Sequence, residues 1–451
     1  MKSGTSRRAE RPARLGTRSG RRTHAVGAVV GALAAVSGGL APNAAAADAQ
    51  SMQWYLGPMQ TEQMWEVSTG EGVKVAVIDT GVNPNTPSLK GQVLADEVSK
   101  AVDYHVTQDY DGHGTTMAEL IAGTGAGGGI QGLAPGAKIV PYRIALKGLE
   151  TRAEEYEKAP PAWKVLRAAA DSDAKIISMS FGGMTSEEDR AAIKYAASKG
   201  KLLVASVGNE GFPDAPARYP YVLGTAAVDS TYTVSKFSEK SSEGFADLSA
   251  PGDKVPGWCD DTFRSYCEQG GTSHATALVS GAAALIWSAH PDWTVNQVTR
   301  ALIDTASRSW PKDKPSKYAG YGFIRPRVVL ADPNYDAGAP DVDPLAKVNG
   351  GDVLAKAGAR DASNTDNTDN TDTDNTENAD NSSSAPSGSA SGASQAPEKG
   401  SAGDASAAGS NAEAAAAEDD SNTLWIALGA AAAVIVIGGA GAAVLRARRA
   451  R

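Results

Sequence analysis

The chain has 451 residues, and 43 Lys and Arg stand against 52 Asp and Glu, which gives a formal net charge of −9. This acidic balance argues against nucleic acid as a partner, because phosphate binding needs a basic face. With two cysteines the chain is not a disulfide scaffold, whereas its central block, residues 48–331, is long enough to bury a large core.

Residues 1–47 match an export signal. They carry eight basic residues and one acidic residue, and the basic part leads into the apolar stretch Ala25–Leu40. The small residues Ala44–Ala47 then suit cleavage by signal peptidase. The apolar stretch is short for a membrane span, which disfavours an uncleaved anchor. A Sec signal is favoured, with a twin-arginine (Tat) signal left open, and residues 48–71 are predicted as an N-terminal extension.

Residues 72–331 alternate apolar runs with helical patterns. The predicted strands are Val73–Ile78, Lys138–Ile144, Lys175–Ser180, Leu202–Val207 and Leu223–Val228. The predicted helices are Thr115–Ala122, Ala162–Ala170, Glu187–Ser198 and a long small-residue helix from Ser273 toward Ser288. This alternation predicts an α/β domain, with a mostly parallel sheet and helices on both faces. Such sheets carry their chemistry at the carboxyl ends of strands.

Three polar motifs in this domain point to acyl transfer. Asp79 follows the strand VKVAVI, His113 lies between two glycines in DGHGT, and Ser273 opens the long helix in GTSHAT. A serine at a helix N-terminus meets backbone N–H groups that can bind an oxyanion. Serine needs a base to become a nucleophile, His113 suits that role, and Asp79 can fix its tautomer. Singly each motif could be a turn, a loop or a helix cap, but together they predict a triad in the order Asp, His, Ser.

The sequence predicts non-catalytic positions for the other polar residues near these motifs. His105 and residues 109–111 are predicted to be solvated loop positions. His274 is predicted to be a packing or rim residue that points away from the nucleophile.

Cys259 and Cys267 are eight residues apart, just before the serine helix. A disulfide is expected outside the cell, and it would stabilise the fold by roughly 2.5 kcal/mol in the chain-entropy model. The alternative is a metal site, but the spacing is not a usual zinc pattern. The bridge is preferred, and we expect it to order the approach to Ser273.

The C-terminal part predicts a tether and an anchor. Residues 332–423 carry 18 acidic and four basic residues in Asp/Asn/Thr and Ser/Gly/Ala sequence, which predicts a disordered acidic linker. Residues 424–445 contain no charge, and a helix over them would span roughly 33 Å against a hydrocarbon core of roughly 30 Å. The arginine-rich tail 446–451 is then cytoplasmic by the positive-inside rule. These features predict a single-pass protein of the cell membrane, bound to the membrane by its C-terminal helix, with its main domain extracellular.

Residues 72–331 resemble the subtilisin-like serine peptidases, or subtilases. VAVIDTGV, DGHGTTMAELIAG and GTSHATALVSGAAAL are similar to the Asp, His and Ser signatures of that family. The resemblance implies a triad of Asp79, His113 and Ser273, with Asn209 of VASVGNEG in the oxyanion hole. The segment SMSFGG resembles the family's substrate-binding strand, which implies contacts from Ser178, Ser180, Phe181 and Gly182. It implies no cofactor for catalysis; structural calcium is common in the family, but no ligand cluster can be assigned here.

The architecture narrows the resemblance to mycosins, which are membrane-anchored subtilases associated with type VII secretion. The signal, the acidic linker, the C-terminal anchor and the lack of a long prodomain carry this resemblance. It implies an extracellular endopeptidase that cleaves protein or peptide substrates and is associated with a type VII secretion membrane complex. Two alternatives remain: a scaffold component in which catalysis is secondary, and a general cell-surface protease.

Overall fold

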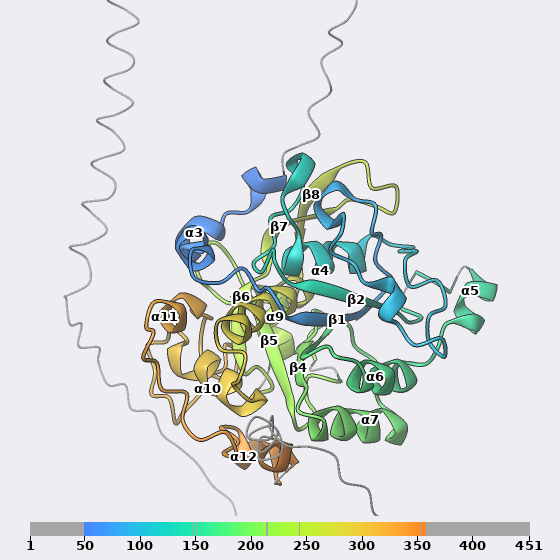
Figure 1. The fold of residues 1–451 in the computed structure, drawn as a ribbon. Coiled ribbons are helices and arrows are strands. Elements are labelled where there is room, and N and C mark those ends of the chain that lie inside the picture. Colours follow the sequence, from blue (N-terminus) through green and yellow to red (C-terminus); the bar gives the residue numbers. More distant parts are fainter. Residues whose placement is uncertain are drawn as a thin grey trace, which may run out of the picture. The chain divides into compact units, whose positions relative to one another are not determined.

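A six-stranded sheet forms the centre of the fold (Figure 1). The computed structural model describes residues 49–146, 148–150, 152–212, 215–242, 244–351 and 353–357. The strand order is β2-β1-β3-β4-β5-β6, and neighbouring strands are parallel. The strands are β1 Lys74–Asp79, β2 Lys138–Arg143, β3 Ile176–Met179, β4 Leu202–Ser206, β5 Val222–Val228 and β6 Leu248–Pro251. They are buried almost throughout, which explains why the sequence shows them as continuous apolar runs.

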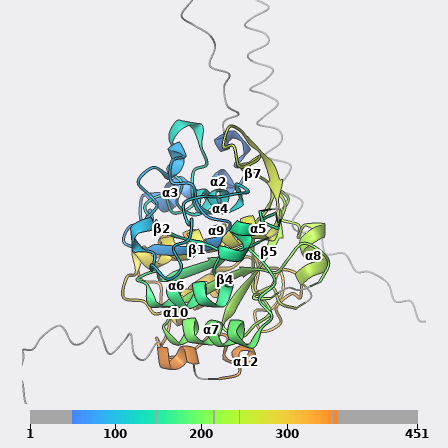
Figure 2. The same ribbon diagram turned by 90° about the vertical axis from the view of Figure 1, so that its right-hand side faces the viewer.

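Helices cover both faces of this sheet (Figures 1 and 2). α4 and α9 lie on one face, and α6 and α7 lie on the other. The longer helices are α4 His113–Ala122, α6 Ala162–Asp171, α7 Glu187–Ser198, α9 Thr272–Ala289 and α10 Val295–Thr305. The shorter ones are α2 Leu56–Met59, α3 Thr61–Trp65, α5 Ala153–Lys158, α8 Lys236–Ser242, α11 Pro326–Leu330 and α12 Ala346–Asn349. The predicted α/β class with a mostly parallel sheet is confirmed.

The central helix α9 contacts five strands of the sheet. Its sequence TSHATALVSGAAALIWSA is rich in Ala, Ser, Thr and Gly, and residues 272–287 are all buried. Small side chains allow a helix to lie close to its neighbours on every side, so no polar face is needed. α9 therefore holds its first turn, with Ser273, at a fixed place beside the sheet.

The N-terminal extension packs onto the domain. Tyr55 and Met64 are buried, and side chains of the extension donate hydrogen bonds to distant backbone carbonyls. These bonds run from Gln53 to Gln131 (2.7 Å), from Trp65 to Leu133 (2.9 Å) and from Ser68 to Leu285 (2.8 Å). The extension is thus part of the folded unit.

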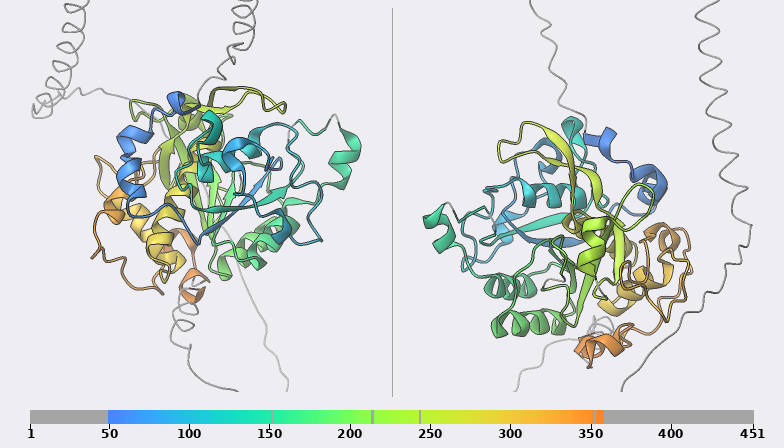
Figure 3. Two further views of the ribbon diagram at one scale, coloured as in Figure 1. Left: turned by 45° about the horizontal axis from the view of Figure 1, so that its top comes forward. Right: turned by 180° about the vertical axis from the view of Figure 1, so that it is seen from behind.

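The packed chain continues beyond the predicted end of the domain at residue 331. In both views of Figure 3, the orange C-terminal segment lies beside the yellow α10, on the side away from α5. Arg300 and Asn296 of α10 donate hydrogen bonds to backbone carbonyls of this segment, and Leu345 and Leu354 are buried. The described residues between 332 and 357 are therefore part of the packed domain, and the predicted start of the linker at residue 332 is wrong. Buried leucines and hydrogen bonds from side chains of α10 to its backbone hold this segment in place, although its composition suggested disorder.

Several predicted segments lie outside the described residues: the signal 1–47, the rest of the linker, the predicted transmembrane helix 424–445 and the tail 446–451. Among the helices that the structure does describe, none combines the length and the apolar character needed to cross a bilayer.

Candidate active site

Asp79 and His113 are in direct contact. His113 Nδ1 lies 2.7 Å from Asp79 Oδ1. Asp79 is the last residue of β1 and is fully buried, and His113 is the first residue of α4. The helix reaches the strand end because Gly114 has no side chain: a Cβ there would lie 2.1 Å from the carbonyl oxygen of Gly81. The missing side chain of Gly114 thus allows His113 and Asp79 to meet.

A second carboxylate, Asp109, organises the same loop. Its Oδ1 accepts hydrogen bonds from Thr80 Oγ1 (2.7 Å) and from the backbone N–H of Gly112 (2.9 Å). Its Oδ2 accepts from Thr115 N (2.8 Å) and Thr115 Oγ1 (2.6 Å). The side chain is 8% exposed, so the prediction of a solvated loop position is wrong for Asp109. The physical reason is that the first N–H groups of α4 need acceptors, and an Asp four residues before His113 supplies one.

The negative charge of these carboxylates raises the pKa of His113. Burial disfavours the imidazolium, but the negative charge and hydrogen bond of Asp79, followed by the charges of Asp109 and Asp111, outweigh it. Together they raise the pKa of His113 to about 9. The ring is therefore a strong base that is still protonated at neutral pH in the free protein.

Ser273 lies in the first turn of α9 and is 9% exposed. Its Oγ donates a hydrogen bond to the carbonyl oxygen of Ser180 at 3.1 Å, and Ser180 Oγ donates to the carbonyl oxygen of Ser273, also at 3.1 Å. Among the hydrogen bonds of the described residues, none joins Ser273 to His113. Rotation about the Cα–Cβ bond of Ser273 would turn its hydroxyl away from Ser180. Hydrogen bonds between catalytic groups are often long without substrate and tighten when substrate binds.

Asn209 faces the start of the same helix. Its Oδ1 accepts hydrogen bonds from Thr272 N (3.0 Å) and Thr272 Oγ1 (3.1 Å), which fixes the amide group. Its Nδ2 therefore points the other way, and it lies 3.3 Å from the position that a Cβ on Gly271 would take. This places one amide donor beside the helix N-terminus that carries Ser273, an arrangement suited to an oxyanion.

The four predicted substrate contacts separate into two groups. Ser180 lies against Ser273, and Phe181 and Gly182 line a hollow of about 280 Å³ with Leu146. Ser178, in contrast, belongs to β3 and is 1% exposed, so its side chain is buried in the core. Between Ser178 and Gly182 the chain thus passes from the buried strand β3 to the hollow.

The two cysteines form a disulfide, with a Cα–Cα distance of 5.4 Å, across the hairpin of β7 Asp253–Trp258 and β8 Tyr266–Gly270. β8 ends three residues before Ser273, as expected for a bridge that orders its approach. The hairpin also packs on α4, because Trp258 N donates to Thr116 Oγ1 (3.0 Å) and Tyr266 Oη donates to Glu119 Oε2 (2.9 Å). The bridge therefore braces the helix of His113 as well.

Glu119 was not singled out by the sequence. It is fully buried in α4, and burial raises its pKa to about 7, against the hydrogen bonds from its neighbours. The available sequence signal was that Glu119 is the one acidic residue of α4 and lies between apolar neighbours, which indicates burial.

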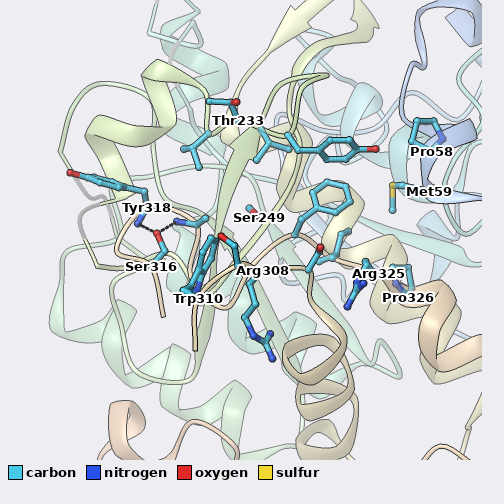
Figure 4. Close-up of a pocket in the computed structure, with 18 of the residues that line it drawn as sticks. Pro58, Met59, Thr233, Ser249, Arg308, Trp310, Ser316, Tyr318, Arg325 and Pro326 are labelled. Atoms are coloured by element: carbon cyan, nitrogen blue, oxygen red, sulfur yellow. Dashed lines mark hydrogen bonds between the residues drawn. The ribbon is translucent and has the colours of Figure 1, made fainter. Parts of the chain in front are cut away.

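A larger pocket of about 730 Å³ lies elsewhere in the domain (Figure 4). It is lined by residues such as Met59, Thr233, Trp310, Tyr318 and Arg325, and its lining contains none of the predicted site residues. Within the described part of the chain, no group of three or more His, Cys, Asp or Glu side chains is placed to hold a metal ion.

Comparisons with known proteins give the relatives of this chain. The profile of the subtilase family matches residues 70–322. The major intracellular serine protease of Bacillus subtilis (strain 168) is 32% identical over 282 residues, which cover 59% of this chain and 85% of that protein. Thermitase of Thermoactinomyces vulgaris is 32% identical over 277 residues, covering 58% and 92%. The solved structure of the MycP3 protease from the type VII (ESX-3) secretion system matches with a TM-score of 0.50 and 29% identity, covering 61% of this chain and 87% of that chain.

Proposed function

Because the chain belongs to the subtilase family of serine endopeptidases, we propose that Ser273 is its nucleophile, His113 its general base and Asp79 the residue that orients the base. The observation that carries this proposal is the 2.7 Å contact between His113 Nδ1 and Asp79 Oδ1. It fixes the ring tautomer that leaves Nε2 to receive a proton from a serine.

In this mechanism the neutral His113 accepts the proton of Ser273 Oγ as the oxygen attacks the substrate carbonyl carbon. The tetrahedral intermediate carries its negative charge on the former carbonyl oxygen, near Asn209 Nδ2 and the N-terminal N–H groups of α9. His113 then gives its proton to the leaving amine, and an acyl-enzyme remains on Ser273. Water, activated by the same imidazole, hydrolyses the ester and restores the enzyme.

A fluorophosphonate probe tests the triad, because it phosphonylates an activated serine. The wild-type protein should be labelled on Ser273, and His113→Ala should lose most of that labelling. Ser280→Ala is the matched control, since Ser280 is a buried serine of α9 whose hydroxyl donates to the carbonyl of Thr276 at 2.9 Å. Labelling that is unaffected by Ser273→Ala, or equal in wild type and His113→Ala, contradicts the proposed roles.

We further propose that the enzyme acts outside the cell, anchored by residues 424–445, in association with a type VII secretion system. The signal-like sequence of residues 1–47, the uncharged segment 424–445 and the similarity to the MycP3 protease support this. Protease shaving of intact cells should remove the domain and leave the C-terminal tail.

A comparison of Ser273→Ala with deletion of the whole protein separates a catalytic role in secretion from a scaffold role. Loss of export by the secretion system in both strains favours catalysis, and loss in the deletion strain alone favours the scaffold.

A further inference from the structure

The pocket of Figure 4 is built from three separate parts of the chain. Pro58 and Met59 come from the N-terminal extension, residues 228 and 232–234 from the end of β5 and the turn after it, and the largest share from the segment 307–327, which leads from α10 into α11. Its volume of about 730 Å³ lies within the usual range for ligand sites, about 300–1,000 Å³. The proposed peptidase chemistry makes no use of this space.

The segment that forms most of the lining is basic, although the chain as a whole is acidic. Residues 308–327 carry six basic residues and one acidic residue, a net charge of +5, whereas the whole chain has a net charge of −9. Three of the basic residues, Arg308, Arg325 and Arg327, line the pocket. Among the described residues none of the three forms an ion pair, and Asp304 of α10 pairs with Lys312 instead. The pocket thus presents positive charge that the described part of the chain does not neutralise.

The guanidinium of Arg325 is only partly used by the fold. Its Nε donates to the carbonyl oxygen of Thr305 at 2.7 Å, and its two Nη atoms have no hydrogen-bond partner among the described residues. Burial, followed by the charges of Arg327 and Arg308, lowers the pKa of Arg325, and no carboxylate opposes this. Arg308 adds charge only, since its Nη1 already donates to three backbone carbonyls. A carboxylate from outside would pair with the free N–H groups of Arg325 and reduce the repulsion.

Aromatic and apolar side chains make up the rest of the lining. Tyr232 is 47% exposed and packs edge-on against Phe323, with ring centroids 4.9 Å apart. Figure 4 shows Trp310 and Tyr318 across the pocket from Met59. Aromatic residues and arginine are the residue types enriched where proteins bind one another. An inorganic anion would leave these rings uncovered, whereas a peptide with carboxylates and apolar side chains would cover them.

We propose that this pocket binds an acidic peptide segment of a partner protein, with a carboxylate on Arg325 and an apolar side chain against Tyr232 and Phe323. The docking surface is distinct from the proposed active site, because none of the predicted site residues lines it. The inference goes beyond the proposed function and does not depend on Ser273 being the nucleophile. Since the charged contacts are partly open to solvent, binding should weaken as salt is added.

The test titrates a fluorescent peptide, in which Asp and Glu alternate with Phe and Leu, with the full-length protein and follows its anisotropy. All proteins carry Ser273→Ala, so that the peptide is not cleaved. We expect Arg325→Met to weaken binding about tenfold or more, because a charge-assisted hydrogen bond is lost, and Tyr232→Ala to weaken it about fivefold. Arg167→Met is the matched control, since it removes an exposed arginine of α6 outside the pocket, and it should stay within about twofold.

A second peptide, with Asn and Gln in place of the acids, should bind at least about tenfold more weakly than the acidic one. The inference is overturned if the acidic peptide shows no saturable binding up to about 1 mM, or if the uncharged peptide binds as tightly. It also fails if Arg325→Met binds as tightly as Arg167→Met. Displacement of the acidic peptide by an equal concentration of inorganic phosphate overturns it too, because that result would show a site for small anions.

Arg327→Met replaces Arg325→Met should the latter fail to fold, since the Arg327 side chain makes no hydrogen bond among the described residues. It should weaken binding several-fold, and unchanged affinity contradicts the inference. A photo-crosslinking form of the peptide then locates the site directly. Crosslinks to residues 307–327 support the proposal, and crosslinks confined to the neighbourhood of residue 273 overturn it. Failure of the proposed function is recognised separately, by the lack of fluorophosphonate labelling on wild-type Ser273.

Discussion

Replacing Asp79 with Asn removes the carboxylate that acts most strongly to raise the pKa of His113. With Asp79 in place that pKa is about 9, and the ordinary value is 6.5. Without it, burial opposes the weaker influence of Asp109 and Asp111, so the pKa should fall to about 6.5 or lower. A fall of this size corresponds to about 3 kcal/mol of lost stabilisation of the imidazolium.

The assay is the pH dependence of kcat/KM on a peptide substrate. Only the neutral imidazole can accept the proton of Ser273, so wild-type activity should rise with pH until about pH 9. In Asp79→Asn the rise should end near pH 6.5 or below. The plateau should also drop by roughly 10⁴-fold, as it does in other triads, because Asn lets the ring take the wrong tautomer.

The sign of the effect on stability follows from the same shift. A raised pKa means that the contact between Asp79 and His113 stabilises the folded protein fully below pH 6.5, and that this contribution is lost as the pH rises through about 9. Asp111→Asn is the control, since Asp111 is exposed and acts on His113 by charge alone. The reasoning is refuted if wild-type activity already levels off near pH 6.5, or if Asp111→Asn moves the profile as far as Asp79→Asn does.

Three further outcomes are expected. Because the folded protein keeps a proton on Glu119 that the unfolded chain releases, wild-type stability should fall by about 3 kcal/mol as the pH rises from about 4.5 to 7, and Glu119→Gln should remove this fall. Melting temperatures at pH 5 and pH 8 measure the difference, and parallel pH profiles of the two proteins contradict the prediction. Replacing Cys259 and Cys267 by Ser should lower the free energy of unfolding by about 2.5 kcal/mol, measured in urea, and an unchanged midpoint would exclude a stabilising bridge. Asn209→Ala should lower kcat by roughly 10²–10³ with little change in KM, and a loss in KM alone would remove Asn209 from the oxyanion hole.

Much of the fold could be predicted from the sequence because buried parallel strands appear as apolar runs. α7 has the predicted bounds, Glu187–Ser198, where a capping box of Ser186 and Asp189 marks its start. β6 was not predicted, because its sequence LSAP forms no apolar run, whereas the equally short β3 lies within the run KIISMS. The antiparallel hairpin β7–β8 was missed because its strands mix polar and apolar residues.

The chemistry of acyl transfer singled out Asp79, His113 and Ser273 in the sequence; the structure brings the first two into contact, and the role of Ser273 stays a prediction. Asp109 and Glu119 were not singled out, because acidic residues are normally exposed and nothing in the sequence alone shows which of them folding will bury. The same holds for the hydroxyl of Ser273: its orientation toward Ser180 depends on how α9 and the end of β3 pack together.

The extension that precedes β1 has a practical consequence for producing this enzyme. A recombinant version starting at Lys74 would lack the side chains that now bond Gln131, Leu133 and Leu285, and it would leave bare the surface that Tyr55 and Met64 cover. Exposed apolar patches of that kind cause aggregation. Expression designs that keep everything from Ala49 onward retain this covering.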